Sequence, residues 1–134
     1  MSQRRRDIPT AVLPQLYVTF PWGGLLASGV KTVEGRAGPL SKFSPWVGNC
    51  IRIHGGGVAF NAVVVAVRHY ATIEEYLEFE GWSRVAPHLA DHADALKVYR
   101  NFYSDEHVKQ KGGMNAIQIQ RMNATPSDAG AALQ

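Results

Sequence analysis

Hydrophobic and polar residues alternate along this chain in several short segments. The segments with period two, or rich in β-branched and aromatic residues, are 16–20, 31–36, 50–54, 58–69 and 114–121, and we predict that each is a strand. The longest apolar run, 62–67, lies inside the fourth of these segments. It is far shorter than the ~18 residues of a membrane-spanning helix, so we interpret it as the buried part of a strand.

Helical signals occur in three other places. Pro21 suits the first turn of a helix of about two turns, because proline has no N–H to donate there. Thr72 and Glu75 form a capping box that begins a helix running to Glu80. The segment 89–103 carries apolar residues near one face of a longer helix. That aromatic face either packs on the sheet or forms a dimer surface.

The remaining segments are predicted to be connections, and they define the fold class. The expected connections are a loop at 37–48, a Gly-rich turn at 55–57, a linker at 82–88 and a charged loop at 104–113. About five strands and about three helices without regular βαβ alternation indicate an α+β fold. We therefore predict a small, mainly antiparallel β-barrel flanked by those helices.

The length of 134 residues corresponds to one domain. We expect residues 1–14 to be a mobile basic segment, 15–121 to be the folded domain, and 122–134 to be a disordered tail without apolar periodicity. The basic start has no apolar core typical of a signal peptide. A single cysteine, Cys50, forms no internal disulfide. Together these features predict a cytoplasmic protein with no membrane association, and a nuclear location is the alternative.

Charge is distributed unevenly along the chain. Residues 1–68 contain eight basic and two acidic residues, whereas residues 69–134 contain six basic and nine acidic ones. Such asymmetry favours a phosphate-bearing partner. The alternative is that Arg4, Arg5 and Arg6 form a solvated tail that supplies half of the excess.

One motif concentrates the charges of the first half. In residues 29–36, Gly-Val-Lys-Thr-Val-Glu-Gly-Arg, the charged residues are Lys31, Glu34 and Arg36. Glu34 and Arg36 share one face of a strand, and a bend at the preceding helix end brings Lys31 to the same side. The motif is either an ordinary surface strand with a Glu–Arg pair or a convergent site.

The octet, preceded by a Pro-containing strand-to-helix turn, resembles the signature of the ASCH domain, a branch of the PUA-like superfamily. The similarity extends over about residues 15–121 and includes Asn49–Ile53, Val63–Tyr70 and Gly112–Ile117. The resemblance implies a PUA-like β-barrel with a cleft beside the motif. It also implies an RNA- or nucleotide-binding module.

The same resemblance implies an alternative activity. Some small bacterial ASCH proteins are amidohydrolases that act on N4-acetylcytidine with a Lys–Thr–Glu triad. Their lysine matches Lys31, their threonine falls at Glu34, and their glutamate falls near Asp94. Thr32 is the neighbouring hydroxyl, two residues out of register. In that reading, Lys31 and Glu34 are the catalytic candidates.

The ligand-binding candidates follow from the chemistry of the motif. Arg36 and Lys31 suit a phosphate, and Glu34 either orients these cations or accepts hydrogen bonds from an exocyclic amine such as that of cytosine. An unpaired base is expected to stack on an aromatic ring. The candidate rings are Trp22, Trp46 and Tyr70, which otherwise belong to the core.

We expect no metal site and no cofactor. His88 and His92 are four residues apart, which suits metal binding, but the pattern supplies no third ligand. His54 and His69 each fall near a strand end, where either is an acid–base candidate beside the cleft or an ordinary edge histidine.

Overall fold

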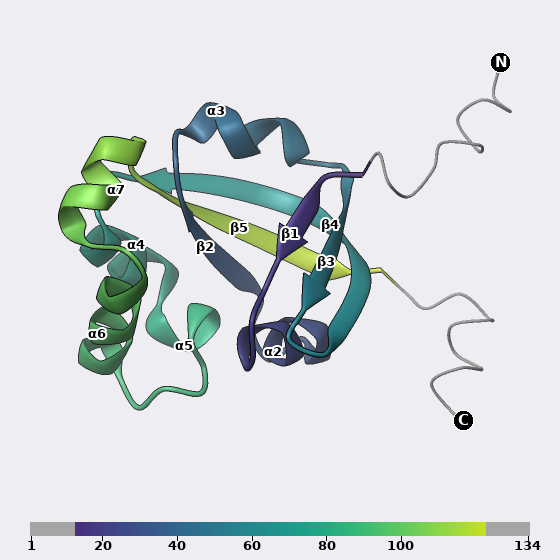
Figure 1. The fold of residues 1–134 in the computed structure, drawn as a ribbon, viewed down its shortest axis with the longest axis horizontal. Helices are drawn as coiled ribbons and strands as arrows, with labels where there is room; N and C mark the ends of the chain where they lie inside the picture. Colours follow the sequence, from purple (N-terminus) through teal and green to yellow (C-terminus); the bar gives the residue numbers. More distant parts are fainter. Residues whose placement is uncertain (1–12, 123–134) are drawn as a thin grey trace, which may run out of the picture.

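The computed structural model describes residues 13–122, which form a curled five-stranded sheet with helices packed around it (Figure 1). The strands are β1 (Gln15–Tyr17), β2 (Val33–Ala37), β3 (Cys50–Gly55), β4 (Val58–Tyr70) and β5 (Met114–Arg121). Their order in the sheet is β1-β3-β4-β5-β2. β1 pairs with β3 in parallel, and every other pair is antiparallel.

Six α-helices and one 3₁₀ turn connect these strands. They are α2 (Trp22–Ser28), α3 (Leu40–Phe43), the 3₁₀ turn η2 (Ser44–Trp46), α4 (Ile73–Glu80), α5 (Trp82–Val85), α6 (His92–Phe102) and α7 (Asp105–Lys111). Helices α4 to α7 gather on one side of the sheet, and α2 and α3 lie at opposite ends of β2 (Figure 1). None of the helices between residues 13 and 122 is long and apolar enough to cross a membrane.

The predicted α+β barrel class is confirmed, and the sheet closes only half of a barrel. β1 and β2 are its two edge strands, and they are not paired with each other in the sheet. We call the gap between these two edge strands the seam. The seam matters because a sheet edge leaves backbone groups and side chains available for other contacts.

The prediction of about three helices was wrong, because several short helices occupy predicted connections. The clearest case is α7, in the predicted charged loop 104–113. Ser104 accepts a hydrogen bond from the backbone N–H of His107, and Gly112 ends the helix at φ 98°. Asp105 begins the first turn and Lys111 ends the last one, as the helix dipole favours. These are ordinary helix signals, and the high charge of the segment concealed them.

Two further boundaries differ from the prediction. α6 begins at His92 instead of Leu89, because Asp91 caps it by accepting from the backbone N–H of Asp94. β2 begins at Val33 instead of Lys31, because the N–H of Thr32 bonds to α5 and not to a strand. The predicted N-cap at Thr72 is present, with the Glu75 N–H donating to its hydroxyl at 3.1 Å, while the Glu75 carboxylate accepts from the N–H of Ala71 instead of that of Thr72.

The core consists of two apolar clusters, and β5 contributes residues to both. One lies between the sheet and the helices and includes Tyr76, Tyr99 and Met114. The other lies inside the curl of the sheet, where Ile51 and Ile117 are fully buried. The predicted basic segment 1–14 and tail 122–134 fall almost wholly outside the described residues, so the domain boundaries stay a prediction.

A substitution at Gly35 tests how tightly β2 packs against α4. A Cβ at position 35 would collide with the Tyr76 hydroxyl and lie 2.9 Å from Met114 Cε. We expect Gly35→Ala to lower the free energy of unfolding by about 1–3 kcal/mol, as overpacked cores do. Gly24→Ala is the matched control, because nothing lies within 4 Å of a Cβ there. Alanine in that helix should raise stability by up to about 1 kcal/mol. Equal melting temperatures for the two variants in thermal denaturation would contradict this packing.

Candidate functional site

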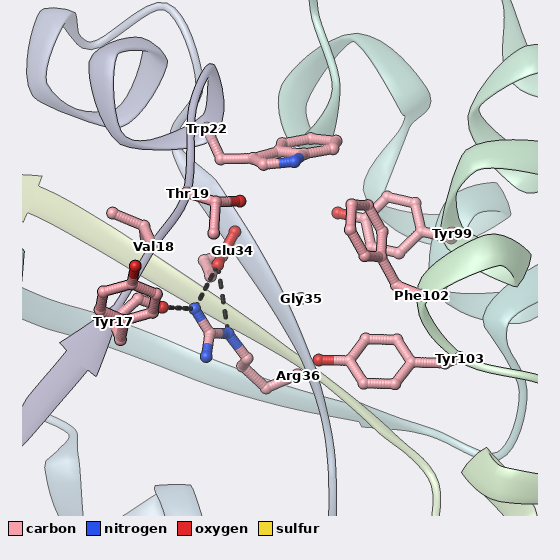
Figure 2. Close-up of a pocket in the computed structure, with 10 residues that line it drawn as sticks. All are labelled: Tyr17, Val18, Thr19, Trp22, Glu34, Gly35, Arg36, Tyr99, Phe102 and Tyr103. Carbon is pink, nitrogen blue, oxygen red and sulfur yellow. Dashed lines mark hydrogen bonds and ion pairs between the residues drawn. The ribbon is translucent and has the colours of Figure 1, made fainter. Parts of the chain in front are cut away.

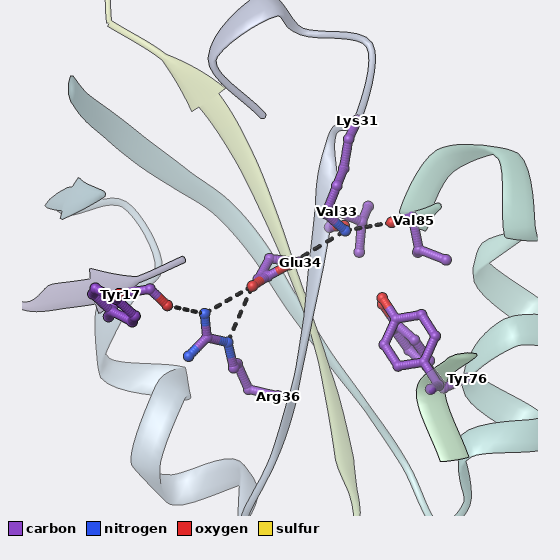
Figure 3. Close-up of polar contacts among 8 residues, drawn as sticks. Tyr17, Lys31, Val33, Glu34, Arg36, Tyr76 and Val85 are labelled. Carbon is purple, nitrogen blue, oxygen red and sulfur yellow. Dashed lines mark hydrogen bonds and ion pairs between the residues drawn. The ribbon is translucent and has the colours of Figure 1, made fainter. Parts of the chain in front are cut away.

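Glu34 and Arg36 project from the same face of β2 and form an ion pair. Arg36 donates from Nε at 3.1 Å and from Nη2 at 2.8 Å to Oε2 of Glu34. Nη2 also donates to the backbone oxygen of Tyr17, at 2.5 Å (Figure 3). Arg36 thus joins β2 to β1 across the seam. Its third nitrogen, Nη1, has no hydrogen-bond partner among residues 13–122.

Lys31 approaches the other oxygen of Glu34 from inside the protein. Gly29 ends α2 with a left-handed φ of 82°, and this bend turns the chain so that the Lys31 side chain is fully buried. The ammonium donates to the backbone oxygens of Val33 and Val85 and lies 3.3 Å from Oε1 of Glu34 (Figure 3). It therefore does not reach the solvent, where we had expected it to meet a phosphate.

The surroundings of Lys31 favour the ammonium form in spite of burial. Burial lowers the pKa of Lys31, and Glu34 opposes that shift. Three oxygen acceptors surround Nζ, and only the ammonium form has three N–H groups to satisfy them. Nζ also lies 5.1 Å from the ring centroid of Trp22, within the range of a cation–π contact. Lys31, Glu34 and Arg36 therefore form one connected group with a net charge of +1.

A pocket of about 230 Å³ opens at the seam, with Glu34 and Arg36 in its wall (Figure 2). The residues lining it come from β1, the loop after it and the start of α2, from β2, and from the end of α6. They are Tyr17, Val18, Thr19, Trp22, Glu34, Gly35, Arg36, Tyr99, Phe102 and Tyr103. The lining is thus largely aromatic around a single carboxylate and a single guanidinium.

The aromatic rings form a wall that faces the ion pair. Trp22 packs against Tyr99 at 5.9 Å and against Phe102 at 6.1 Å between ring centroids. The Tyr99 hydroxyl bonds to that of Tyr76 at 2.9 Å. Burial raises the pKa of Tyr99, and it also raises the pKa of Tyr103. Both phenols are therefore neutral near pH 7.

The structure brings together four of the six predicted ligand-binding residues. Glu34, Arg36 and Trp22 line the pocket, and Lys31 lies directly behind Glu34. Trp46 and Tyr70 do not line it, so the placement of these two rings beside the motif is corrected.

Packing explains where those two rings lie. Trp46 packs edge-on against Phe43, 5.1 Å between centroids, beside the cluster inside the sheet. Tyr70 lies at the end of β4, where its hydroxyl donates to Oε2 of Glu80 at 2.5 Å. Its ring stacks on Phe79 at 6.0 Å. Both rings are therefore used in packing away from the seam.

The residues of the predicted hydrolase triad do not assemble in this pocket. Asp94 lies in the first turn of α6, where it accepts from the backbone N–H of Ala90, and it does not line the pocket. Thr32 does not line it either.

The histidines take separate positions. His88 lies edge-on to Trp22, 4.7 Å between ring centroids. His69 contacts Asn115 at 2.8 Å through Nδ1, and His54 lies edge-on to Tyr17 at 5.7 Å. Within residues 13–122, no group of three or more His, Cys, Asp or Glu side chains is placed to hold a metal ion.

Seven lining residues were not predicted as site residues: Tyr17, Val18, Thr19, Gly35, Tyr99, Phe102 and Tyr103. Sequence pattern placed the last three near one face of a helix. It did not indicate that Phe102 stays 58% exposed at the rim of a pocket. Their convergence depends on how α6 is docked beside the seam, which is a long-range feature.

Comparisons with known proteins identify the fold. The hypothetical protein PH0355 shares 30% identity with a TM-score of 0.70, covering 81% of this chain and 97% of that protein. Protein PF0455 from Pyrococcus furiosus shares 27% identity with a TM-score of 0.65, and the match covers 84% of this chain and 100% of that protein.

More distant similarity is found to an ASCH protein from Zymomonas mobilis. Its structure shares 19% identity with a TM-score of 0.54, covering 79% of this chain and 65% of that protein. A single-residue mutant of it matches at 18% identity with a TM-score of 0.55, covering 87% of this chain and 77% of its own. No family model and no curated protein matches the chain.

The buried ion pair generates a stability prediction. Lys31→Met fills a similar volume but leaves two backbone oxygens and Oε1 of Glu34 without their cation. We expect the free energy of unfolding to fall by about 3 kcal/mol, measured by urea denaturation. Lys42→Met is the control, since Lys42 is exposed, and it should change stability by less than about 0.5 kcal/mol. A Lys31→Met variant as stable as the control would show that the buried cation is dispensable.

A second prediction reports the charge of Lys31 directly. Burial lowers the pKa of His88, and the positive charge of Lys31 lowers it further. If Lys31 is an ammonium, Lys31→Met should raise the pKa of His88, because a nearby like charge disfavours the imidazolium. The titration of the His88 ring by NMR measures this, with Lys42→Met as the control. An unchanged pKa in a folded Lys31→Met variant would mean that Lys31 is uncharged.

Proposed function

The chain belongs to the family of the hypothetical protein PH0355 and has the ASCH fold, and on this premise we propose that its pocket at the seam binds the base of a nucleotide. One observation carries the proposal. The Glu34–Arg36 pair sets a carboxylate beside a guanidinium in the wall of an aromatic-lined pocket. The resemblance of the octet to ASCH domains, which implies RNA or nucleotide binding, agrees with this chemistry.

The ion pair retains hydrogen-bonding capacity for a base edge. A carboxylate has about four acceptor positions, and Glu34 uses three of them for Lys31 and Arg36. Arg36 Nη1 remains as a donor. Cytosine presents an exocyclic amine next to a ring nitrogen acceptor, which matches an acceptor beside a donor. Uracil presents its N–H between two carbonyl oxygens, and these would approach the carboxylate unfavourably.

Size and stacking also support a single base as the ligand. The volume of about 230 Å³ is below the ~300–1,000 Å³ typical of pockets for drug-sized ligands. Trp22 and Phe102 offer ring surfaces in the same pocket as the ion pair. Base–aromatic stacking contributes about 1–3 kcal/mol per base, so a base held by these rings needs few polar contacts to be bound.

The alternative function is hydrolysis of an amide such as that of N4-acetylcytidine. Its specific support is Thr19, a pocket hydroxyl that shares the lining with Glu34 (Figure 2). Against it, a Lys31 base would need a free lone pair, whereas Nζ is surrounded by three oxygens. We therefore rank binding above hydrolysis.

Calorimetric titration with CMP and UMP tests the proposal. We expect CMP to bind more tightly than UMP. Glu34→Gln should weaken CMP binding by about 1–3 kcal/mol, because the amide can no longer act only as an acceptor. Arg36→Ala should weaken binding of both nucleotides, and Arg36→Lys, which keeps the charge without the fork, should restore part of it. Glu78→Gln and Lys42→Ala alter exposed charges elsewhere and are the matched controls.

Two results would overturn this ranking. Stronger CMP binding by Glu34→Gln would make Glu34 a counter-ion for Arg36 and nothing more. Turnover of N4-acetylcytidine, followed by absorbance and lost in Lys31→Ala, would establish the hydrolase instead. Circular dichroism of each variant separates loss of binding from loss of fold.

A further inference from the structure

A second pocket lies between α4 and α7, on the side of the molecule away from β1 (Figure 1). It has a volume of about 410 Å³ and shares no lining residue with the pocket at the seam. The turn that begins α4 lies on one side of it and α7 on the other. The lining residues are Ala71, Thr72, Ile73, Asp105, Glu106, Val108 and Lys109. We call this pocket the α4–α7 groove.

The α4–α7 groove has an apolar floor and an acidic rim. Ile73 and Val108 on its floor also belong to the core between the sheet and the helices. Asp105 and Glu106 are exposed at its rim, and Lys109 is the one basic residue among those that line it. Apolar surface bordered by carboxylates is complementary to an apolar side chain with cations beside it.

Phe79 extends this surface along α4. Thr72, Glu75 and Phe79 recur three and four residues apart, so they lie on one face of the helix. Phe79 is 70% exposed, and its ring stacks on Tyr70 with centroids 6.0 Å apart and planes within 4° of parallel. A large aromatic ring held at the surface is typical of the residues that anchor protein–protein contacts.

A polar network fixes the ring on which Phe79 stacks. Tyr70 donates to Oε2 of Glu80 at 2.5 Å, and Arg68 donates to both oxygens of Glu80, at 2.6 and 2.7 Å. The third nitrogen of Arg68 donates to Oε1 of Gln118 at 2.8 Å. Phe79 is therefore presented on a rigid support, which lowers the conformational entropy that a partner loses by binding it.

Charge identifies the kind of partner that this surface fits. The sequence of α4, Ile-Glu-Glu-Tyr-Leu-Glu-Phe-Glu, contains four glutamates and no basic residue. Glu80 is paired with Arg68. The other three are exposed: Glu74, Glu75 and Glu78. These charges repel a nucleic-acid backbone and attract Lys and Arg side chains, so the surface suits a basic polypeptide and not the nucleotide that we propose for the seam.

We propose that the α4–α7 groove and Phe79 together bind an extended, basic segment of another protein. One apolar side chain of the segment occupies the groove, a second lies against Phe79, and Lys or Arg residues pair with Glu75 and Glu106. Thr72 and Phe79 are seven residues apart, about 10 Å along the helix at about 1.5 Å per residue. An extended chain crosses that distance in about three residues.

Selection of short random peptides displayed on phage, with the full-length chain as the bait, tests this proposal without a known partner. We expect the enriched peptides to carry Lys or Arg beside aromatic or aliphatic residues. Fluorescence anisotropy then measures the affinity of the most enriched peptide for the protein and its variants. That affinity should fall as salt is added, because the carboxylates are exposed and their attraction is screened.

Removal of the aromatic ring tests the anchor. Phe79→Ala should weaken binding of the selected peptide about fivefold or more, because the variant lacks the ring against which an apolar side chain packs. Phe20→Ala is the matched control and should leave the affinity unchanged, because Phe20 is 83% exposed between β1 and α2 and does not line the groove. Circular dichroism of both variants separates loss of binding from loss of fold.

Changes of charge test the rim in both directions. Glu75→Gln and Glu106→Gln keep the size of the side chain, and each should weaken peptide binding about two- to fivefold. Lys109→Gln should strengthen it about twofold, because the variant removes the cation that repels the peptide. Glu78→Gln and Lys111→Gln are the matched controls, since Glu78 lies on a different face of α4 from Phe79 and Lys111 does not line the groove.

The outcomes separate this inference from the proposed function. Failure to enrich basic peptides, or equal affinity of the selected peptide for the variants and their controls, overturns the inference. Loss of peptide binding in Arg36→Ala instead would move the peptide to the seam and also overturn it. Self-association that Phe79→Ala abolishes, seen by analytical ultracentrifugation, would overturn it by making a second copy of this chain the occupant. CMP binding should be the same in Phe79→Ala and in the unmodified chain, so the proposed function stands or fails separately.

Discussion

Glu34 connects the interior of this protein to its surface, and the site depends on that connection. One carboxylate oxygen meets the buried ammonium of Lys31, and the other meets the guanidinium of Arg36 at the seam. Without Glu34, Lys31 would be a buried cation held by backbone carbonyls alone, which is costly in a medium of low polarity. Without the ion pair to Glu34, the Arg36 guanidinium would lose the carboxylate that orients it toward β1.

The half-barrel explains why this group lies beside a pocket. A fully closed barrel would pair β1 with β2 through their backbones and leave no room for side chains between them. Here Arg36 bridges the two edges through a single hydrogen bond to Tyr17, and α6 closes the gap with aromatic rings. The pocket therefore exists because the barrel is not fully closed. The Glu34–Arg36 pair bridges the gap between β1 and β2 and supplies the charged groups of the pocket wall.

The local sequence pattern was sufficient to predict the strands and the charged motif. It was insufficient to predict all of the helices that pack against them. The period-two alternation placed β3, β4 and β5 close to their observed bounds, and the α+β class followed from their spacing. The bend that brings Lys31 to the same side as Glu34 was predicted from Gly29, a residue that adopts positive φ without strain. α7 was missed because its caps were outweighed by its charge.

The aromatic part of the site was mostly hidden from the sequence for a physical reason. Trp22, Trp46 and Tyr70 are equally plausible stacking rings by composition, and only tertiary packing distinguishes them. Trp46 packs on Phe43 and Tyr70 bonds to Glu80, whereas Trp22 faces the seam. The depth of Lys31 was hidden too, since a lysine with three internal acceptors, one of them 54 residues distant, has no local signature.

The central claim is that the Glu34–Arg36 pair recognises a base, and a crystal structure of the protein grown with CMP tests it most directly. The account predicts that the cytosine ring lies in the pocket at the seam against Trp22 or Phe102. The exocyclic amine of the base should lie within hydrogen-bond distance of Glu34, and Nη1 of Arg36 should donate to the adjacent ring nitrogen. A nucleotide bound elsewhere, for example beside Phe79 and Tyr70, with the pocket at the seam lacking it, would contradict the account.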